Sequence, residues 1–295
     1  MGRGLRPSIR PRPRRLRDSG ADTEAERALA RGSGPHQCAA RGSGVNSGIR
    51  YLEIGAADLD RSRHFYAELL GLAEVDRPDA GAATACWFDA GPALVKVVQV
   101  VNGDPGEWRD DDLQGGIRHA GFKTADVDGL ISRLEAAGTR VTAPPRDVLG
   151  DVRIAFFLDP DGARLELVRG ALAYERVGSP RLVAAEAAGL PGPDAPPRFD
   201  HVGITASDFD TTSRYWRSVG YEVIGDIRHH DDPRGFLMTY LGAGGSVVEI
   251  FSFDVATAQP AAWAENRLGL RGIGVVIPGG AAVDVPDGVH AEVAR

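Results

Sequence analysis

Apolar and polar residues alternate in a short stretch that recurs three times along the chain, at 51–54, 119–122 and 201–204. Alternation of this kind predicts a half-buried strand. Seven positions after each stretch begins, the chain carries an Asp-x-Asp pair. An Asp at a helix N-cap, with a second acid in the first turn, favours the start of a helix. Each strand is therefore predicted to lead directly into a helix.

Each predicted helix has an apolar face and ends at a glycine, at Gly71, Gly138 or Gly220. Three strand candidates follow each glycine, so one repeat has the order βαβββ. The repeats start 68 and 82 residues apart, and repeats of this kind take priority in predicting a fold. We therefore predict an α+β protein. The nine following strands are expected at 72–77, 83–89, 93–101, 139–143, 152–158, 163–169, 221–227, 235–241 and 245–252.

A fourth repeat begins at 271–277 with the same apolar alternation but without an Asp-x-Asp pair. We interpret it as degenerate or truncated. Residues 171–197 lack periodicity and end in a proline-rich run, which is typical of a linker. The pattern thus predicts one domain of two full units at 48–170, a linker at 171–197, and a second domain at 198–295.

The first 47 residues differ in composition from the rest. Residues 1–17 contain seven Arg and no acid, and a polar stretch without periodicity follows. Such a segment cannot bury enough apolar surface to order itself, so 1–47 is predicted to be a disordered tail. A transit peptide or a tether to an anionic surface is the alternative.

Charge and cysteine content exclude several classes of function. The net charge of -7 and pI near 5.5 argue against a nucleic-acid partner. No apolar run approaches the ~18 residues of a membrane span, so a cytoplasmic location without membrane association is expected. Two cysteines cannot form a disulfide framework or a cysteine metal cluster.

One tight turn in the second repeat leads into a strand with an unexpected acid. Asp159-Pro160-Asp161-Gly162 has the residues of a hairpin turn. Glu166 then stands between two leucines of the next strand. Burying a carboxylate is costly unless it is paired, hydrogen-bonded or bound to a metal.

The repeat gives Glu166 a candidate neighbour. In each unit a polar residue of the last strand follows the Asp that starts the helix. The separations are 38, 40 and 41 positions, and the polar residues are Lys96, Glu166 and Glu249. If first and last strands are neighbours, His119 shares a face with Glu166, and His201 with Glu249. Imidazole and carboxylate ligands suit Fe, Zn, Mn, Ni or Co. A buried His–Glu hydrogen bond in each unit is the alternative.

The first unit departs from this pattern, because Tyr51 stands at the His position and Lys96 at the Glu position. Glu53 lies on the same strand face as Tyr51. Lys96 is expected to pair with Glu53 or Glu166, or to act as a functional residue with a depressed pKa. A structural lysine that extends toward solvent is the other interpretation. The run at 229–232, two His and two Asp, is interpreted as a solvated loop.

The strand–helix openings of units two and three, the 159–167 hairpin and the helix exit at 65–72 resemble the vicinal oxygen chelate superfamily. That group includes glyoxalase I, fosfomycin and bleomycin resistance proteins, and extradiol dioxygenases. The resemblance implies half-barrels of two βαβββ units around one site, with metal ligands from first and last strands. On these positions His119, Glu166, His201 and Glu249 match ligands, whereas Tyr51 and Lys96 do not.

Neighbouring units usually pair in this superfamily, which would give two incomplete sites. Pairing of unit two with unit three, within a chain or across a homodimer, would instead collect two His and two Glu. The leading hypothesis is a metal-dependent lyase, isomerase or dioxygenase acting on a small oxygenated molecule, with Tyr51, Glu53 or Lys96 in proton transfer. The alternatives are a metal-free binding protein of the bleomycin-resistance type, with Lys96 and Trp87 lining its cleft, and a tandem with a vestigial site.

Overall fold

The computed structural model describes residues 47–77, 84–149, 152–277 and 285–294. The predicted tail therefore lies outside the described residues, apart from Ser47. These described residues belong to one compact unit. Within its described residues, no helix is long and apolar enough to cross a membrane.

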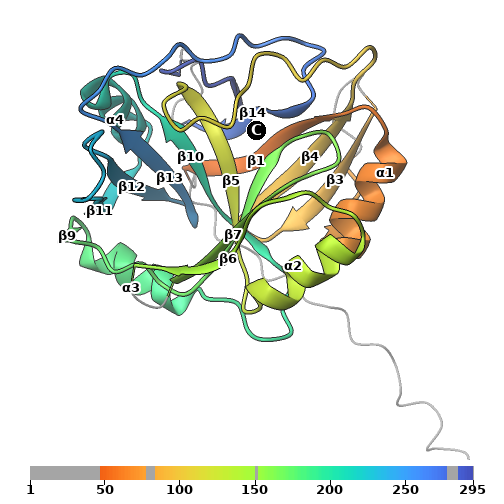
Figure 1. The fold of residues 1–295 in the computed structure, drawn as a ribbon, viewed down its shortest axis with the longest axis horizontal. Helices are drawn as coiled ribbons and strands as arrows, with labels where there is room; N and C mark the ends of the chain where they lie inside the picture. Colours follow the sequence, from red (N-terminus) through yellow and green to blue (C-terminus); the bar gives the residue numbers. More distant parts are fainter. Residues whose placement is uncertain (1–46, 78–83, 150–151, 278–284, 295) are drawn as a thin grey trace, which may run out of the picture. The chain divides into compact units, whose positions relative to one another are not determined.

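The described strands form two mixed sheets (Figure 1). The six-stranded sheet has the order β15-β14-β1-β4-β3-β2 and the nine-stranded sheet the order β6-β7-β8-β5-β10-β13-β12-β11-β9. The strands of the first are β1 (Gly48–Ala56), β2 (Ala73–Glu74), β3 (Ala85–Ala90), β4 (Ala93–Gln99), β14 (Gly269–Val276) and β15 (Ala291–Val293). Those of the second are β5 (Gly116–Lys123), β6 (Val141–Val148), β7 (Val152–Leu158), β8 (Arg164–Arg169), β9 (Arg176–Val177), β10 (Arg198–Thr205), β11 (Glu222–Arg228), β12 (Leu237–Ala243) and β13 (Ser246–Ser252).

The helices begin where the Asp-x-Asp pairs predict. They are α1 (Leu59–Arg63), which continues as the π-helix η1 (His64–Leu69), then α2 (Val127–Ala136), α3 (Pro180–Ala188) and α4 (Phe209–Ser218). The Asp58, Asp126 and Asp208 carboxylates accept hydrogen bonds from backbone N–H groups of the first turns of α1, α2 and α4, so each is an N-cap. Each of the nine strands predicted after the helices is also present. The α+β repeat is confirmed.

Unit two pairs with unit three, and unit one pairs with unit four. The opening strands β5 and β10 are antiparallel neighbours, which joins unit two to unit three. Strands β1 and β14 pair in the same way, which joins unit one to unit four. The expectation that neighbouring units pair was therefore wrong. Each sheet combines strands from 48–170 with strands from 198–295. The division of the chain into domains at these limits stays a prediction.

The segment predicted as a linker, 171–197, contains β9 and α3. Strand β9 pairs with β11 at the edge of the nine-stranded sheet, and Leu182 and Val183 of α3 pack against the buried cluster around Met238 and Tyr240. Pro180 at the first helical position is a start signal, because its missing N–H would be unpaired there anyway. The segment thus forms part of the fold around the nine-stranded sheet.

The hairpin at 159–162 has the predicted turn. Gly162 adopts a positive φ of 90°, and Asp159 is buried beneath it. Its carboxylate accepts hydrogen bonds from the Tyr66 hydroxyl at 2.8 Å and from the backbone N–H groups of Asp161 and Ala163 at 3.0 and 2.7 Å. Asp159 therefore joins the turn to the first helical segment of the chain.

Asp159→Ala is expected to destabilise the protein by about 3–5 kcal/mol, because it leaves three donors without their acceptor. Urea unfolding followed by circular dichroism measures the change. The exposed loop residue Asp231 supplies the control variant Asp231→Ala, which should shift stability by less than about 0.5 kcal/mol. Equal shifts for the two variants would contradict the role given to Asp159.

Candidate metal centre

Four strands of the nine-stranded sheet bring two imidazoles and two carboxylates together. His119 lies on β5 and His201 on β10, the central antiparallel pair. Strand β8 flanks β5 and β13 flanks β10, both in parallel register. Glu166 is the register partner of Gly121, and Glu249 is the partner of Gly203. We call His119, Glu166, His201 and Glu249 the His–Glu cluster.

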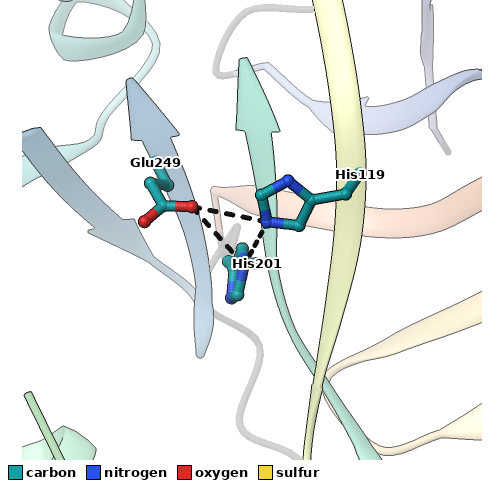
Figure 2. A group of neighbouring side chains, drawn as sticks. All are labelled: His119, His201 and Glu249. Atoms are coloured by element: carbon teal, nitrogen blue, oxygen red, sulfur yellow. Dashed lines mark hydrogen bonds and ion pairs between the residues drawn. The ribbon is translucent and has the colours of Figure 1, made fainter. Parts of the chain in front are cut away.

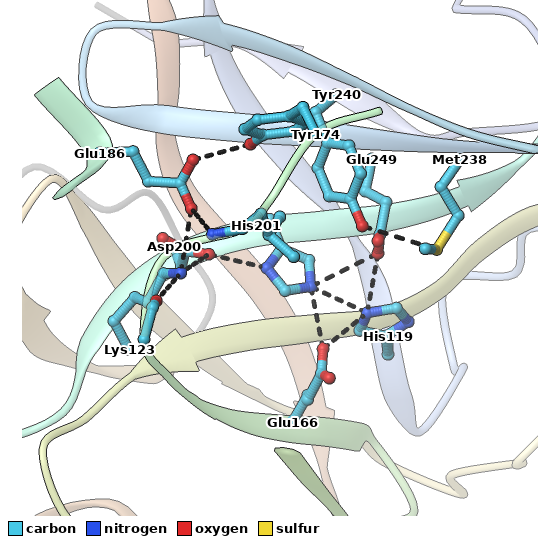
Figure 3. A network of polar contacts seen from close by, with 12 residues as sticks. His119, Lys123, Glu166, Tyr174, Glu186, Asp200, His201, Met238, Tyr240 and Glu249 are labelled. Atoms are coloured by element: carbon cyan, nitrogen blue, oxygen red, sulfur yellow. Dashed lines mark hydrogen bonds and ion pairs between the residues drawn. The ribbon is translucent and has the colours of Figure 1, made fainter. Parts of the chain in front are cut away.

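The ligand atoms of the cluster converge. The Nε2 atoms of His119 and His201 are 2.9 Å apart, and Glu166 Oε2 lies 3.2 and 3.1 Å from them. Glu249 Oε2 lies 3.4 and 3.6 Å from the same two nitrogens. Figure 2 shows His119, His201 and Glu249 pointing toward one another, and Figure 3 shows the two carboxylates approaching the imidazoles from opposite sides.

These spacings fit a metal ion. Ligands that bind one ion at about 2.0–2.2 Å are separated from each other by roughly 3.0–3.6 Å in tetrahedral or octahedral arrangements. The group whose ligand atoms all lie within 4.8 Å of one another comprises His119, His201 and Glu249, and Glu166 meets the two imidazoles from the opposite side. The donor set of two imidazole nitrogens and two carboxylate oxygens suits Zn, Fe, Mn, Co or Ni.

Burial requires that the charges of the His–Glu cluster be balanced within it. All four residues of the cluster are at most 6% exposed. Burial raises the pKa of the Glu166 carboxyl, but hydrogen bonds from His119 and His201 outweigh it and bring the pKa to about 2. Burial lowers the pKa of His201, but hydrogen bonds from Asp200 and Glu166 raise it well above its usual value. Two buried carboxylates thus face two imidazoles, and either protons or a metal ion must supply the balancing positive charge.

Two glycines make room for the imidazoles. In the β5–β10 register, His119 is opposite Gly203 and His201 is opposite Gly121. A Cβ on Gly203 would lie 2.3 Å from the His119 ring, and a Cβ on Gly121 would lie 2.1 Å from the His201 ring. The spacing His-x-Gly in both opening strands therefore has a steric reason.

Gly203→Ala is expected to displace the His119 ring and to weaken metal binding at least about tenfold, as a change in a residue supporting a ligand does. Competition with a fluorescent chelator measures the affinity. Gly192→Ala is the matched control, because a Cβ there meets nothing within 4 Å. If the two variants bind metal equally well, the steric account of the His-x-Gly spacing fails.

A mostly apolar cavity of about 210 Å³ opens onto the cluster. All four cluster residues line it, together with Lys123, Tyr174, Glu186 and Asp200 on one side. Its apolar wall comes from both units and from the segment before α3. That wall consists of Val148, Leu149, Val152, Ile154, Phe156, Val168, Leu172, Phe236, Met238, Tyr240, Val247 and Phe251.

The six-stranded sheet carries an equivalent set of positions with different residues. In the β1–β4 register Lys96 is opposite Glu53, and in the β14–β15 register Glu292 is opposite Gly274. These are the positions that Glu166 and Glu249 hold in the other sheet. Tyr51 faces Gly274, whose added Cβ would lie 2.1 Å from the tyrosine ring. We call Tyr51, Glu53, Lys96, Arg271 and Glu292 the Lys96 cluster.

Charges within the Lys96 cluster are paired internally. The Lys96 ammonium donates to Glu53 at 2.5 Å and lies 3.8 Å from Glu292. Arg271 Nε lies 3.1 Å from the second oxygen of Glu53, and the Tyr51 hydroxyl donates to Glu292. Two cations and two carboxylates therefore neutralise one another. An ammonium stands where the His–Glu cluster would hold an ion.

The predicted site residues thus divide between the two sheets. His119, Glu166, His201 and Glu249 come together as one group. Tyr51, Glu53 and Lys96 do not lie beside them, contrary to expectation, and they are not among the residues lining the cavity. Lys96 pairs with Glu53, one of the two partners expected for it. Their predicted catalytic role therefore has no support from the geometry.

Trp87 and the run at 229–232 lie at different places in the structure. Trp87, expected in a pocket with Lys96, is buried against Tyr51 in the six-stranded sheet. In the run at 229–232, His229 stacks on Phe236 and lines the cavity, whereas His230 is exposed and contacts Glu175. The loop interpretation therefore applies to His230, while His229 belongs to the cavity wall.

Sequence reasoning missed several residues of these sites. Glu292 was overlooked because the fourth unit looked truncated, although an acid in its last strand was a signal. Asp200 was overlooked because it directly precedes His201, and alternation along a strand would place it on the opposite face. The glycine two positions after each His was visible in both opening strands, but its purpose depends on the pairing of β5 with β10.

Comparisons with known proteins agree with this geometry. Residues 48–167 match the family model of the Glyoxalase/Bleomycin resistance protein/Dioxygenase superfamily. The anthracycline biosynthesis protein DnrV of Streptomyces peucetius is 33% identical over 148 residues, which cover 48% of this chain and 50% of that protein. The related DauV of Streptomyces sp. (strain C5) is 30% identical over 174 residues, covering 57% of this chain and 58% of that protein. The chain thus spans only half to three-fifths of these two relatives.

Shorter relatives and solved structures point to the same group. The glutathione transferase FosA of Serratia marcescens is 31% identical over 127 residues, covering 42% of this chain and 82% of that protein. Glyoxalase I from Zea mays has a similar fold, with a TM-score of 0.50 at 22% identity over 72% of this chain and 73% of that one. Together with the repeated βαβββ units, these matches show that the chain belongs to the glyoxalase/bleomycin resistance protein/dioxygenase superfamily.

Proposed function

We propose that this protein is a metal-dependent enzyme in which His119, Glu166, His201 and Glu249 hold one divalent transition-metal ion. The proposal is carried by two Nε2 atoms 2.9 Å apart in a buried site, with an oxygen of each carboxylate 3.1–3.6 Å from both of them. Such an ion supplies Lewis-acid stabilisation of negative charge on vicinal oxygens of a substrate. One chain contributes all four side chains, so this site does not require a second copy.

The surrounding residues determine what reaches the site. The aromatic walls of Phe156, Phe236 and Phe251 exclude water and favour an apolar molecule whose oxygenated end points to the cluster. His119 is held between two of these rings, with centroid distances of 5.3 Å to Phe156 and 5.8 Å to Phe251. The two buried carboxylates, on opposite sides of the imidazoles, are the groups placed to accept a proton from a bound substrate.

Metal-independent sequestration of an apolar ligand is the second candidate. The apolar cavity supports it, as does the similarity to two proteins named for anthracycline biosynthesis. Under this candidate no metal is needed in the His–Glu cluster, and the aromatic wall provides the affinity. The ligand class would then be a planar aromatic compound.

A vicinal-oxygen probe distinguishes the two candidates. Calorimetry is used to titrate 2,3-dihydroxynaphthalene into metal-loaded and chelator-treated protein. The proposal predicts binding at least about tenfold tighter to the metal-loaded form, because only that form can coordinate both oxygens. Naphthalene, which has the same ring system without the hydroxyls, is the control. Its affinity should be the same for the metal-loaded and the chelator-treated protein. Equal affinity of the probe for both forms would favour sequestration.

A further inference from the structure

We propose that Asp200 is a positioning residue that fixes the orientation and tautomer of His201 toward the metal. This inference rests on the proposed metal site and adds a residue to it. Asp200 and His201 are consecutive in β10, and consecutive strand residues normally point to opposite faces of a sheet. A carboxylate should therefore not reach the neighbouring imidazole in a regular strand.

A β-bulge in β10 allows the Asp200 side chain to reach the His201 imidazole. Phe199 pairs with Phe122 and His201 pairs with Gly121, so Asp200 is an extra residue without a partner on β5. Bulges of this kind bend a strand locally and redirect a side chain. The Asp200 Oδ2 atom consequently lies 3.0 Å from His201 Nδ1 (Figure 3).

A buried ammonium faces the Asp200 carboxylate and connects it to a further element. Lys123 of β5 lies 4.0 Å from Asp200 Oδ2 and is 2% exposed. The same ammonium donates to the Gly170 carbonyl at 2.8 Å and to Glu186 of α3 at 3.2 Å. Glu186 also accepts a hydrogen bond from the Tyr174 hydroxyl at 2.7 Å. The segment predicted as a linker thus supplies the far end of a chain of charges, largely shielded from solvent, that leads to His201.

The contact gives His201 a defined chemical role. With Nδ1–H donating to Asp200, Nε2 is the ring nitrogen turned toward Glu166 and Glu249, at 3.1 and 3.6 Å. Nε2 donates its proton in a hydrogen bond to Glu166 in the metal-free protein and presents a lone pair when a metal takes the place of that proton. A metal needs that lone pair, and a carboxylate on the other ring nitrogen makes the imidazole a more basic ligand. His119 lacks this support in its own strand. Arg118, the bulged residue before it in β5, contacts Gln114 and the Arg109 carbonyl instead.

Asp200→Asn tests the inference, because asparagine keeps the size of the side chain and removes its charge. We expect metal affinity, measured by chelator competition, to fall by about 10–100-fold. We also expect the visible absorption spectrum of the Co²⁺-loaded protein to shift, because the basicity of one ligand has changed. Asp200→Glu, with its carboxylate kept, should recover part of the affinity.

The control variant is Asp226→Asn. Asp226 is also a buried acid of the nine-stranded sheet, paired with Arg176 and Thr239, and it does not line the cavity. It should lower stability without changing metal affinity, which separates a loss of folding from a loss of positioning. If Asp200→Asn binds metal like the unaltered protein, the inference is overturned and the metal site stands.

A measurement on metal-free protein separates the inference from the metal proposal. The ¹⁵N and ¹H chemical shifts of the His201 Nδ1–H group report the hydrogen bond that this group donates. We expect Nδ1–H to donate to the Asp200 carboxylate in the unaltered protein, and its shifts to change in Asp200→Asn, where the acceptor has lost its charge. A protein that binds no metal but shows this change would contradict the proposed function and retain the Asp200–His201 contact. Identical shifts in both proteins would overturn that contact.

Discussion

Replacing His119 with alanine is expected to lower the affinity for a divalent transition metal by more than about 100-fold, beyond the 10–100-fold typical of changes outside the ligand set. The same loss is expected for His201→Ala, because the two Nε2 atoms lie 2.9 Å apart and would share one ion. Chelator competition with Co²⁺ or Zn²⁺ measures both affinities. Circular dichroism of the metal-free variants checks that they fold.

His64→Ala is the control for these two variants. His64 is exposed and contacts Glu68 on the surface of η1, so its removal should leave metal affinity unchanged. One outcome would contradict a site shared by His119 and His201. If only one of the two buried His variants loses metal, then units two and three do not contribute to the same ion.

Glu53→Gln is expected to destabilise the fold by about 3–5 kcal/mol, the cost of removing one partner from a buried ion pair. Glu53 is 4% exposed and contacts both Lys96 and Arg271, at 2.5 and 3.1 Å. The glutamine would leave Lys96 with Glu292 at 3.8 Å as its remaining carboxylate. Urea unfolding of the metal-free protein measures the change in the free energy of unfolding.

The same variant also tests the separation of the two clusters. Because Glu53 belongs to the six-stranded sheet and does not line the cavity, metal affinity should be unchanged in Glu53→Gln. Glu68→Gln, which alters an exposed acid of η1, is the control and should cost less than about 1 kcal/mol. A stability change of similar size in both variants would show that the Lys96 cluster contributes little to the fold.

Most of the fold could be predicted from local signals. The Asp-x-Asp caps and the glycines after them marked the helices, and alternation marked the strands. The register between first and last strands followed from the repeat, so the pairs His119–Glu166 and His201–Glu249 could be proposed from spacing alone. The neighbours of Glu166 in the structure include His119, as that spacing indicated.

The pairing of units could not be predicted in this way. All opening strands have similar alternation, so the choice between β5–β10 and β1–β5 depends on long-range packing that no local pattern records. The segment at 171–197 was also misleading, because its proline-rich end suggested separate domains. Its helix α3 instead places Glu186 beside Lys123. The expectation that Tyr51, Glu53 and Lys96 lie beside the His–Glu cluster came from the same wrong pairing.

The bulges could not be predicted either. Arg50, Arg118, Asp200 and Arg271 each precede the first site position of their unit, and each is the extra residue of its strand. In a regular strand their side chains would point away from the site face. In two cases the bulge instead brings the side chain onto the cluster, as Asp200 does for His201 and Arg271 does for Glu53.

The metal content of the purified protein tests the central claim most directly. After loading with Co²⁺ or Zn²⁺ and removal of unbound metal, elemental analysis should give one ion per chain. That ion should be lost in the His119→Ala/His201→Ala double variant and kept in Lys96→Met. Two ions per chain would mean that the Lys96 cluster also binds metal, and a stoichiometry of zero would contradict the proposed metal centre.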